Sequence, residues 1–124
     1  MNKQILTENA PKAIGPYSQA IQSGSLLFVS GVMPIDPSTN ALVENTIKAK
    51  AKQVMKYIDG VLKAAGYTVD DVVKTTCFLS DINNFAAFNE VYGNYFTSKP
   101  ARSCMAVKDL PKAALVEVEV IANK

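Results

Sequence analysis

Residues 115–121 read LVEVEVI, an apolar run that carries two full negative charges. Side chains alternate between the two faces of a β-strand, so this run has two different faces. One face consists of valines alone: Val116, Val118 and Val120. The other face holds both glutamates: Leu115, Glu117, Glu119 and Ile121. The valine face predicts a strand packed against helices, and the glutamate face is then the second face of the sheet.

The pattern leaves two explanations for the glutamate face. An antiparallel sheet commonly keeps one polar face in water, which would suit Glu117 and Glu119. Leu115 and Ile121 flank the glutamates, however, and suggest that this face is covered too. Because the sequence offers helices for only one layer, the cover would be another subunit.

A second apolar run, RSCMAV at 102–107, begins with an arginine. Alternation puts Arg102, Cys104 and Ala106 on one face of this strand. The residues alone allow two roles for the charge of Arg102. It could form an internal ion pair with a glutamate, or it could bind a substrate.

The regions before these strands show helical and strand patterns in turn. Apolar residues recur every three or four positions in 46–66 and again in 83–98, which predicts two amphipathic helices. Asn45 or Thr46 can cap the first helix and Asp81 or Asn83 the second. The remaining expected elements are a hairpin over 14–31, a loop over 33–45 with turn residues at 36–40, and a β-branched strand over 71–80.

These elements predict the order β-β-α-β-α-β-β. We therefore expect an α+β fold with a mixed sheet and two helices packed on one face. The 124 residues suit one domain, 1–124, because no linker or repeat divides them.

Composition excludes several classes of function. The chain has no histidine, which removes Ser-His-Asp and Cys-His catalysis and the commonest zinc ligand, and no metal site is expected. The net charge of +2 is too small to indicate nucleic-acid binding. No apolar stretch approaches the length of a membrane span. Cys77 and Cys104 form no CxxC motif, and reduced thiols in a cytoplasmic protein are expected.

Five fragments in order resemble the RidA (YjgF-type) family of imine deaminases. They are IGPYSQAI, LLFVSG, DVVKTTCFLSDINNFAAFNEVY, PARSCMAV and LPKAALVEVEVIA, and the resemblance runs from about residue 8 to residue 122. It implies a chorismate-mutase-like α+β fold and a homotrimer with sites in the clefts between subunits. It also implies hydrolysis of 2-iminobutanoate and 2-iminopropanoate to 2-oxo acids and ammonia, with no cofactor.

The resemblance assigns roles to three residues. Arg102 matches the arginine that binds the substrate carboxylate, a task suited to its planar fork. Glu117 matches the glutamate that orients or deprotonates the attacking water. Tyr17 matches a site tyrosine, and packing at a subunit interface is the alternative for it. Glu119 shares the face of Glu117, but the family pattern assigns it no such role.

The resemblance also indicates residues that line the pocket. Ser30 and Gly31 match lining positions, although Gly31 could also be a simple strand-end turn. Asn89 matches a position near the cleft, and a surface amide is its alternative. Phe85 would form a pocket wall or belong to the core. Cys104 would line the pocket and offer its main-chain N–H to the carboxylate, since no histidine is available to activate its thiol.

Two other functions compete with the deaminase. One is a regulatory trimer that binds small carboxylates without turnover. The other is an endoribonuclease or translation inhibitor, which the small net charge and the lack of histidine argue against.

Overall fold

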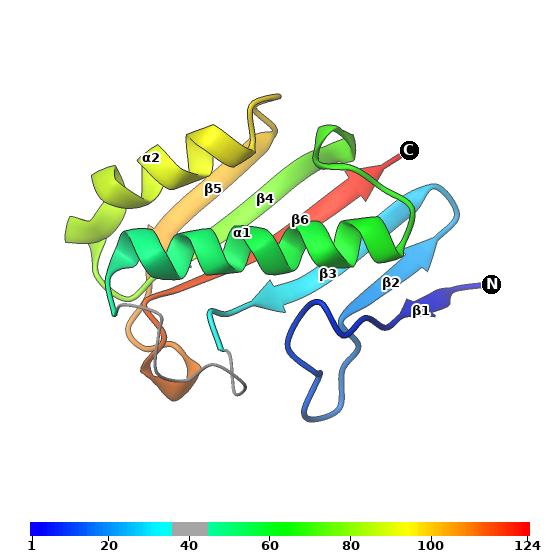
Figure 1. The fold of residues 1–124 in the computed structure, drawn as a ribbon, viewed down its shortest axis with the longest axis horizontal. Coiled ribbons are helices and arrows are strands. Elements are labelled where there is room, and N and C mark those ends of the chain that lie inside the picture. Colours follow the sequence, from blue (N-terminus) through cyan, green and yellow to red (C-terminus); the bar gives the residue numbers. More distant parts are fainter. Residues whose placement is uncertain (36–44) are drawn as a thin grey trace.

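A computed structural model describes residues 1–35 and 45–124. Figure 1 shows one sheet with both helices lying across the same face. The strands are β1 (Lys3–Ile5), β2 (Ala20–Ser23), β3 (Leu26–Val32), β4 (Val72–Leu79), β5 (Ala101–Ala106) and β6 (Val116–Asn123), and the helices are α1 (Ile47–Ala64) and α2 (Phe85–Tyr95). The expected turn residues at 36–40 lie outside the described residues.

The sheet has the order β1-β2-β3-β6-β4-β5, so LVEVEVI forms a central strand. Only β4 and β5 run parallel, and every other neighbouring pair is antiparallel. The predicted mixed α+β sheet is therefore confirmed. The strand β1 was not predicted, because a three-residue edge strand with the sequence KQI has too short a pattern to recognise.

Helix α1 begins and ends as its sequence indicates. The Thr46 hydroxyl accepts the Ala49 N–H at 3.3 Å, which identifies Thr46 as the N-cap. Gly66 has a φ of +82°, the left-handed backbone that favours glycine just beyond a helix end. The buried face holds Ile47, Ala51, Val54, Met55, Tyr57, Ile58, Val61 and Leu62.

Helix α2 follows a short 3₁₀ turn, Ile82–Asn84. The Asp81 carboxylate accepts the Asn83 N–H at 2.9 Å, so Asp81 caps this turn and not α2 itself. Asn84 is the N-cap residue of α2, without a side-chain hydrogen bond. The aromatic side of α2 packs inward through Phe88 and Tyr92.

The two faces of the sheet differ as the alternation in β6 predicts. Val116, Val118 and Val120 are buried against the helices. We call the opposite side, which no described helix covers, the open face. Besides Glu117 and Glu119, it exposes large apolar groups, among them Leu26, Phe28 and Met105. An open apolar face of this kind is a surface on which another protein chain can pack.

Candidate functional site

Arg102 extends from the edge strand β5 toward helix α2. Its Nη1 donates a hydrogen bond to Asn89 Oδ1 at 2.7 Å. The guanidinium carbon lies 4.6 Å from the centre of the Tyr92 ring and 5.6 Å from that of Phe85, within range of cation–π attraction. Arg102, Asn89, Tyr92 and Phe85 form what we call the arginine cluster. It brings together three of the residues that the sequence singled out.

The arginine cluster contains no acidic side chain. The ion pairs found among residues 1–35 and 45–124 join Lys48 to Glu90 and Lys63 to Asp59. The internal ion pair that pattern alone allowed for Arg102 is therefore not present in the described chain. Its guanidinium has five N–H donors, and Asn89 takes one of them. The remaining N–H donors of the Arg102 guanidinium are available to bind an anion.

Buried contacts hold the Tyr92 ring in place beneath the arginine. The Tyr92 hydroxyl lies 2.7 Å from the Thr75 hydroxyl, and Thr75 is fully buried on β4. Phe96 packs against the Tyr92 ring with a centroid separation of 4.6 Å. The role of Tyr92 as a platform for Arg102 was not predicted from the sequence. The spacing of Arg102 from an aromatic helix carried no signal for it.

Cys104 lies on the same strand face as Arg102, beside Cys77 of β4 in the parallel register. Both thiols are free. Burial raises the pKa of Cys77 to about 12, and burial also raises the pKa of Cys104. Both cysteines are therefore neutral thiols at neutral pH, which argues against a nucleophilic role for Cys104.

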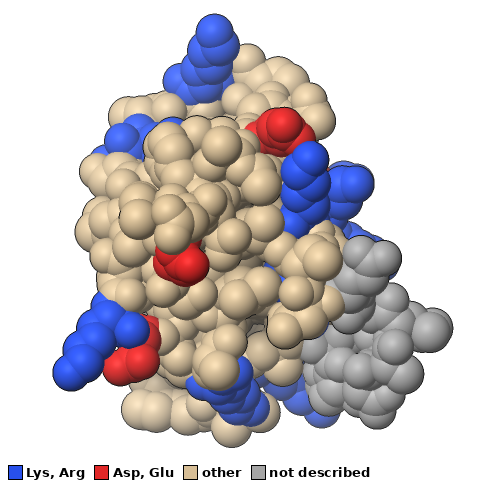
Figure 2. Space-filling view, turned by 90° about the vertical axis from the view of Figure 1, so that its left-hand side faces the viewer, with Lys and Arg blue, Asp and Glu red and all other residues tan. Residues whose placement is uncertain are grey.

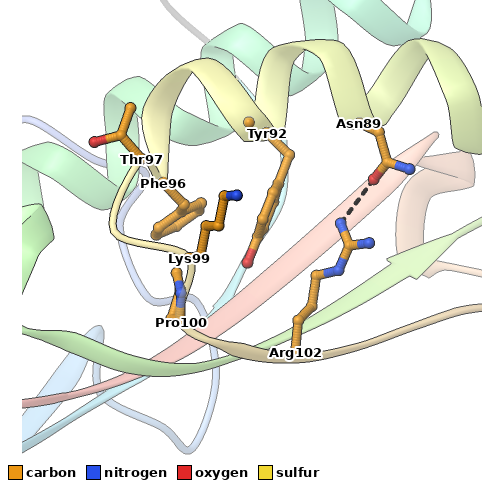
Figure 3. A pocket seen from close by; sticks show the side chains of 8 residues that line it. Asn89, Tyr92, Phe96, Thr97, Lys99, Pro100 and Arg102 are labelled. Atoms are coloured by element: carbon orange, nitrogen blue, oxygen red, sulfur yellow. Dashed lines mark hydrogen bonds between the residues drawn. The ribbon is translucent and has the colours of Figure 1, made fainter.

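A pocket of about 270 Å³ opens between the end of α2 and the start of β5. Figure 3 shows Arg102 and Lys99 rising toward α2, with Tyr92 and Asn89 directed down toward them. Phe85 and Cys104, which were expected to line the pocket, are not among its lining residues: Asn89, Tyr92, Gly93, Phe96, Thr97, Lys99, Pro100 and Arg102.

Glu117 belongs to a second group of residues, on the open face. A Cβ atom on Gly31 would collide with the Glu117 carboxylate. Gly31 follows Ser30 within a register shift of the β3–β6 pairing, between Val29 and Val32. Gly31 is thus more than a strand-end turn, because the missing side chain leaves the space that the Glu117 carboxylate occupies.

Ser30 and Tyr17 lie at the same end of the sheet as Gly31. The Ser30 hydroxyl donates to the Ser18 carbonyl at 2.6 Å, and the Ser30 N–H donates to the Gln19 carbonyl at 3.0 Å. Tyr17 is next to Ser18 in the chain and is 51% exposed, so its ring is available to another molecule. Tyr17, Ser30, Gly31 and Glu117 form what we call the glutamate cluster.

Gln19 holds residues 7–11 in place through hydrogen bonds, a role that the sequence did not reveal. This buried amide accepts the Thr7 N–H at 2.8 Å and donates to the carbonyls of Thr7, Ala10 and Pro11. Buried polar groups of this kind are expected to be fully hydrogen-bonded. Gln19 therefore ties residues 7–11 to the start of β2, directly beside Tyr17.

The Glu117 carboxyl has an environment that favours its protonated form. Partial burial raises its pKa, and the negative charge of Glu119, two residues along the same strand face, raises it further. A carboxyl whose pKa is raised toward neutrality is better matched to proton transfer in water than an ordinary exposed one.

The two clusters lie on opposite faces of the sheet. Arg102 points to the helix side, where Asn89 contacts it, whereas Glu117 pairs in register with Phe78 and points to the open side. One chain therefore does not bring its arginine and its glutamate to a single pocket.

Other kinds of site find little support in the described chain. Residues 1–35 and 45–124 contain no group of three His, Cys, Asp or Glu side chains that could hold a metal ion. None of the helices in those ranges has the length and apolarity needed to cross a bilayer. Figure 2, which views the edge at the left of Figure 1, shows basic side chains scattered around the periphery and no continuous basic surface on that face.

Comparison with known proteins gives one consistent result. The family model described as Endoribonuclease L-PSP matches residues 7–124. A RutC family protein of Pyrococcus horikoshii is 53% identical over 100% of this chain and 99% of its own length. The 2-iminobutanoate/2-iminopropanoate deaminase of Salmonella typhimurium is 46% identical over 98% of each chain.

A solved structure extends this result to the fold. The crystal structure of Escherichia coli TdcF with bound serine superposes with a TM-score of 0.91, at 39% identity, over 98% of each chain. The chain therefore belongs to the Endoribonuclease L-PSP family, the YjgF/RidA family that its sequence fragments resemble.

Proposed function

We propose that this protein hydrolyses 2-imino acids such as 2-iminobutanoate and 2-iminopropanoate to 2-oxo acids and ammonia. The observation that carries the proposal is the state of Arg102. Its guanidinium is partly buried, held by an amide and an aromatic ring, and has no acidic partner among the described residues. An arginine so held is a preformed receptor for a carboxylate.

The chemistry of an imine suits the groups that this chain offers. An imine carbon is already electrophilic, so hydrolysis requires positioning of water and a proton carrier. Glu117 takes a proton from water as the water oxygen adds to the imine carbon. That proton goes to the imine nitrogen, which gives a carbinolamine. The proton of its hydroxyl group then passes to the same nitrogen, the C–N bond breaks, and ammonia leaves as the C=O bond forms. One imine and one water thus give one 2-oxo acid and one ammonia.

The proposed site requires more than one copy of the chain. Arg102 and Glu117 lie on opposite faces of the sheet, so an arginine cluster can meet a glutamate cluster only across a subunit interface. The open face exposes Leu26, Phe28 and Met105, which a neighbouring copy would bury. We therefore propose a homotrimer in which each site takes Arg102, Asn89 and Cys104 from one subunit. Tyr17, Ser30, Gly31 and Glu117 come from the next subunit.

Two relatives bear on the class of ligand. One relative carries the name of the proposed deaminase, and the TdcF structure contains serine, a small molecule with a carboxylate. Both support a pocket for a compact amino-acid-like substrate. The family description also contains the word endoribonuclease, and the absence of histidine from this chain argues against that activity here.

The test is release of ammonia and 2-oxo acid from imines that a separate enzyme generates in the assay. We expect the wild-type protein to accelerate release above the spontaneous rate. Arg102→Lys keeps the charge but loses the planar fork, so activity should fall steeply and binding of 2-oxobutanoate should weaken by about 1.5–3 kcal/mol.

Three outcomes separate the alternatives. Binding of 2-oxo acids without acceleration would favour the regulatory carboxylate-binding trimer. Unchanged binding in Arg102→Lys would show that the arginine is structural. A monomer in sedimentation or light scattering would leave the two clusters apart and would contradict the intersubunit site.

A further inference from the structure

The pocket beside Arg102 has a second positive group at its other side. Lys99 lines it together with Arg102, and Thr97 adds a hydroxyl. Figure 3 shows the Lys99 side chain rising from the segment before β5 and the Arg102 side chain rising from β5, both toward α2. Between them the lining is aromatic or apolar, from Tyr92, Phe96 and Pro100.

The backbone directs Lys99 in a way that is unusual for a lysine. Its φ is +55°, in the left-handed region that side chains other than glycine rarely adopt. The Lys99 N–H donates to the Phe96 carbonyl at 3.1 Å, which closes a turn directly after α2. This turn sets Lys99 at the pocket, and Pro100 follows it into β5.

The charges of this pocket are unbalanced. Its eight lining residues include two cations and no aspartate or glutamate. Neither cation takes part in the ion pairs found among the described residues, which involve Lys48 and Lys63. A pocket with two unpaired cations separated by apolar surface is complementary to a short ligand that carries an anionic group at each end.

We propose that Lys99 makes this pocket selective for dicarboxylic substrates, 2-imino acids whose side chain ends in a second carboxylate. The inference rests on the proposed function, because it uses Arg102 as the receptor for the first carboxylate. The methylene groups between the two carboxylates then run along the aromatic and apolar lining of the pocket, and the second carboxylate meets the Lys99 ammonium. The pocket volume, about 270 Å³, is near the lower end for small-molecule sites and suits a chain of this size.

The test compares two five-carbon probes, 2-oxoglutarate and 2-oxopentanoate. The first ends in a carboxylate and the second in a methyl group. Calorimetry on the full chain should show 2-oxoglutarate binding about three- to fivefold more tightly, the range of a partly solvated ion pair. Raising the salt concentration should reduce this preference.

Two substitutions at Lys99 and one control sharpen the test. Lys99→Asn removes the charge and keeps a residue that tolerates left-handed backbone, so the ratio of the two affinities should approach one. Lys99→Glu should reverse the preference. Lys56→Glu makes the same charge change on the exposed side of α1, outside the pocket lining, and should leave the ratio at its wild-type value.

The possible failures are distinguishable. Equal affinity for both probes, with both lost in Arg102→Lys, overturns the role of Lys99 and leaves the proposed function standing. A preference for 2-oxoglutarate that persists in Lys99→Glu also overturns it. Absence of binding for both probes in the wild-type protein overturns this inference together with carboxylate recognition by Arg102.

Discussion

The arginine cluster and the glutamate cluster differ in how much of their surroundings one chain supplies. Arg102 is held by Asn89 and lies over Tyr92, which is itself fixed by the buried Thr75. Glu117 lies on the open face, where Gly31 leaves space for its carboxylate, and Tyr17, in the loop before β2, is half exposed. The first cluster is held in place within one chain, whereas the second has fewer contacts within the chain and, in the proposed trimer, is completed by a neighbouring subunit.

This difference separates two tasks. A receptor for a carboxylate gains affinity from rigid, preorganised groups, because fewer side chains lose conformational freedom when the ligand binds. A group that transfers protons requires a raised pKa and controlled access to water, and partial burial beside Glu119 supplies the first of these. We therefore expect substitutions in the arginine cluster to affect binding and stability, and substitutions in the glutamate cluster to affect turnover.

Glu117→Gln should have the largest effect. Glutamine has nearly the same shape but cannot take up a proton as a carboxylate does, so imine turnover should fall by about 10²-fold or more. Binding of 2-oxobutanoate and trimer formation should persist. Initial rates of 2-oxo acid release, corrected for spontaneous hydrolysis, measure the loss, and Glu119→Gln is the matched control. A loss that appears in Glu119→Gln instead would show that the wrong glutamate has been assigned.

The same variant should not lose stability. The folded state raises the pKa of Glu117, so the stability that its protonated form contributes is present below the ordinary pKa and is lost as pH rises through the folded pKa. Glutamine stays neutral at every pH, so the variant avoids the cost of burying the ionised carboxylate. The melting temperature of Glu117→Gln at neutral pH should equal or exceed that of the wild-type protein. A marked decrease would identify Glu117 as structural.

Thr75→Val tests whether the arginine cluster is held rigidly by the buried hydrogen bond beneath it. Valine has nearly the shape of threonine but leaves the buried Tyr92 hydroxyl without the Thr75 oxygen, 2.7 Å away. The free energy of unfolding in urea should fall by about 1–3 kcal/mol, the usual effect of an unsatisfied buried polar group. Binding of 2-oxobutanoate should weaken as the ring beneath Arg102 loosens.

The double variant Thr75→Val with Tyr92→Phe removes both hydroxyls together. It should recover most of the lost stability, since neither partner remains unsatisfied. If the double variant is as unstable as the sum of the two single variants, the hydrogen bond is not what holds the ring.

Strand alternation and helical periodicity were sufficient to predict most of the fold. The faces of β6, the Thr46 cap and the positions of both helices follow from local spacing, which the sequence displays directly. The edge strand β1 was not predicted, because three residues are too few to show an alternating pattern. Its pairing with β2 depends on residues 20–22, which are distant from it in the sequence, and not on its own pattern.

The candidate site was less accessible to sequence reasoning. Residue identities and the family resemblance indicated Arg102 and Glu117, but only the register of β5, β4 and β6 shows that they point to opposite faces. Three contacts join residues that are distant in the chain. Tyr92 packs beneath Arg102, Gly31 leaves space for Glu117, and Gln19 forms hydrogen bonds with residues 7–11. Such contacts leave no spacing signal in a single sequence.

Glu119→Gln should have the smallest effect, a change in pH dependence rather than in maximal rate. In the proposed reaction the ionised form of Glu117 is the base, so activity should fall as pH drops through its pKa, which Glu119 helps to raise. Removing the Glu119 charge lowers that pKa, and the acidic limb of the rate profile should therefore move to lower pH. The ratio of variant to wild-type rates at each pH cancels the titration of the imine itself. High salt should shrink the displacement, because Glu119 is exposed and its charge is screened. A displacement to higher pH, or none at low salt, would show that Glu117 is not the proton acceptor whose ionisation controls the rate.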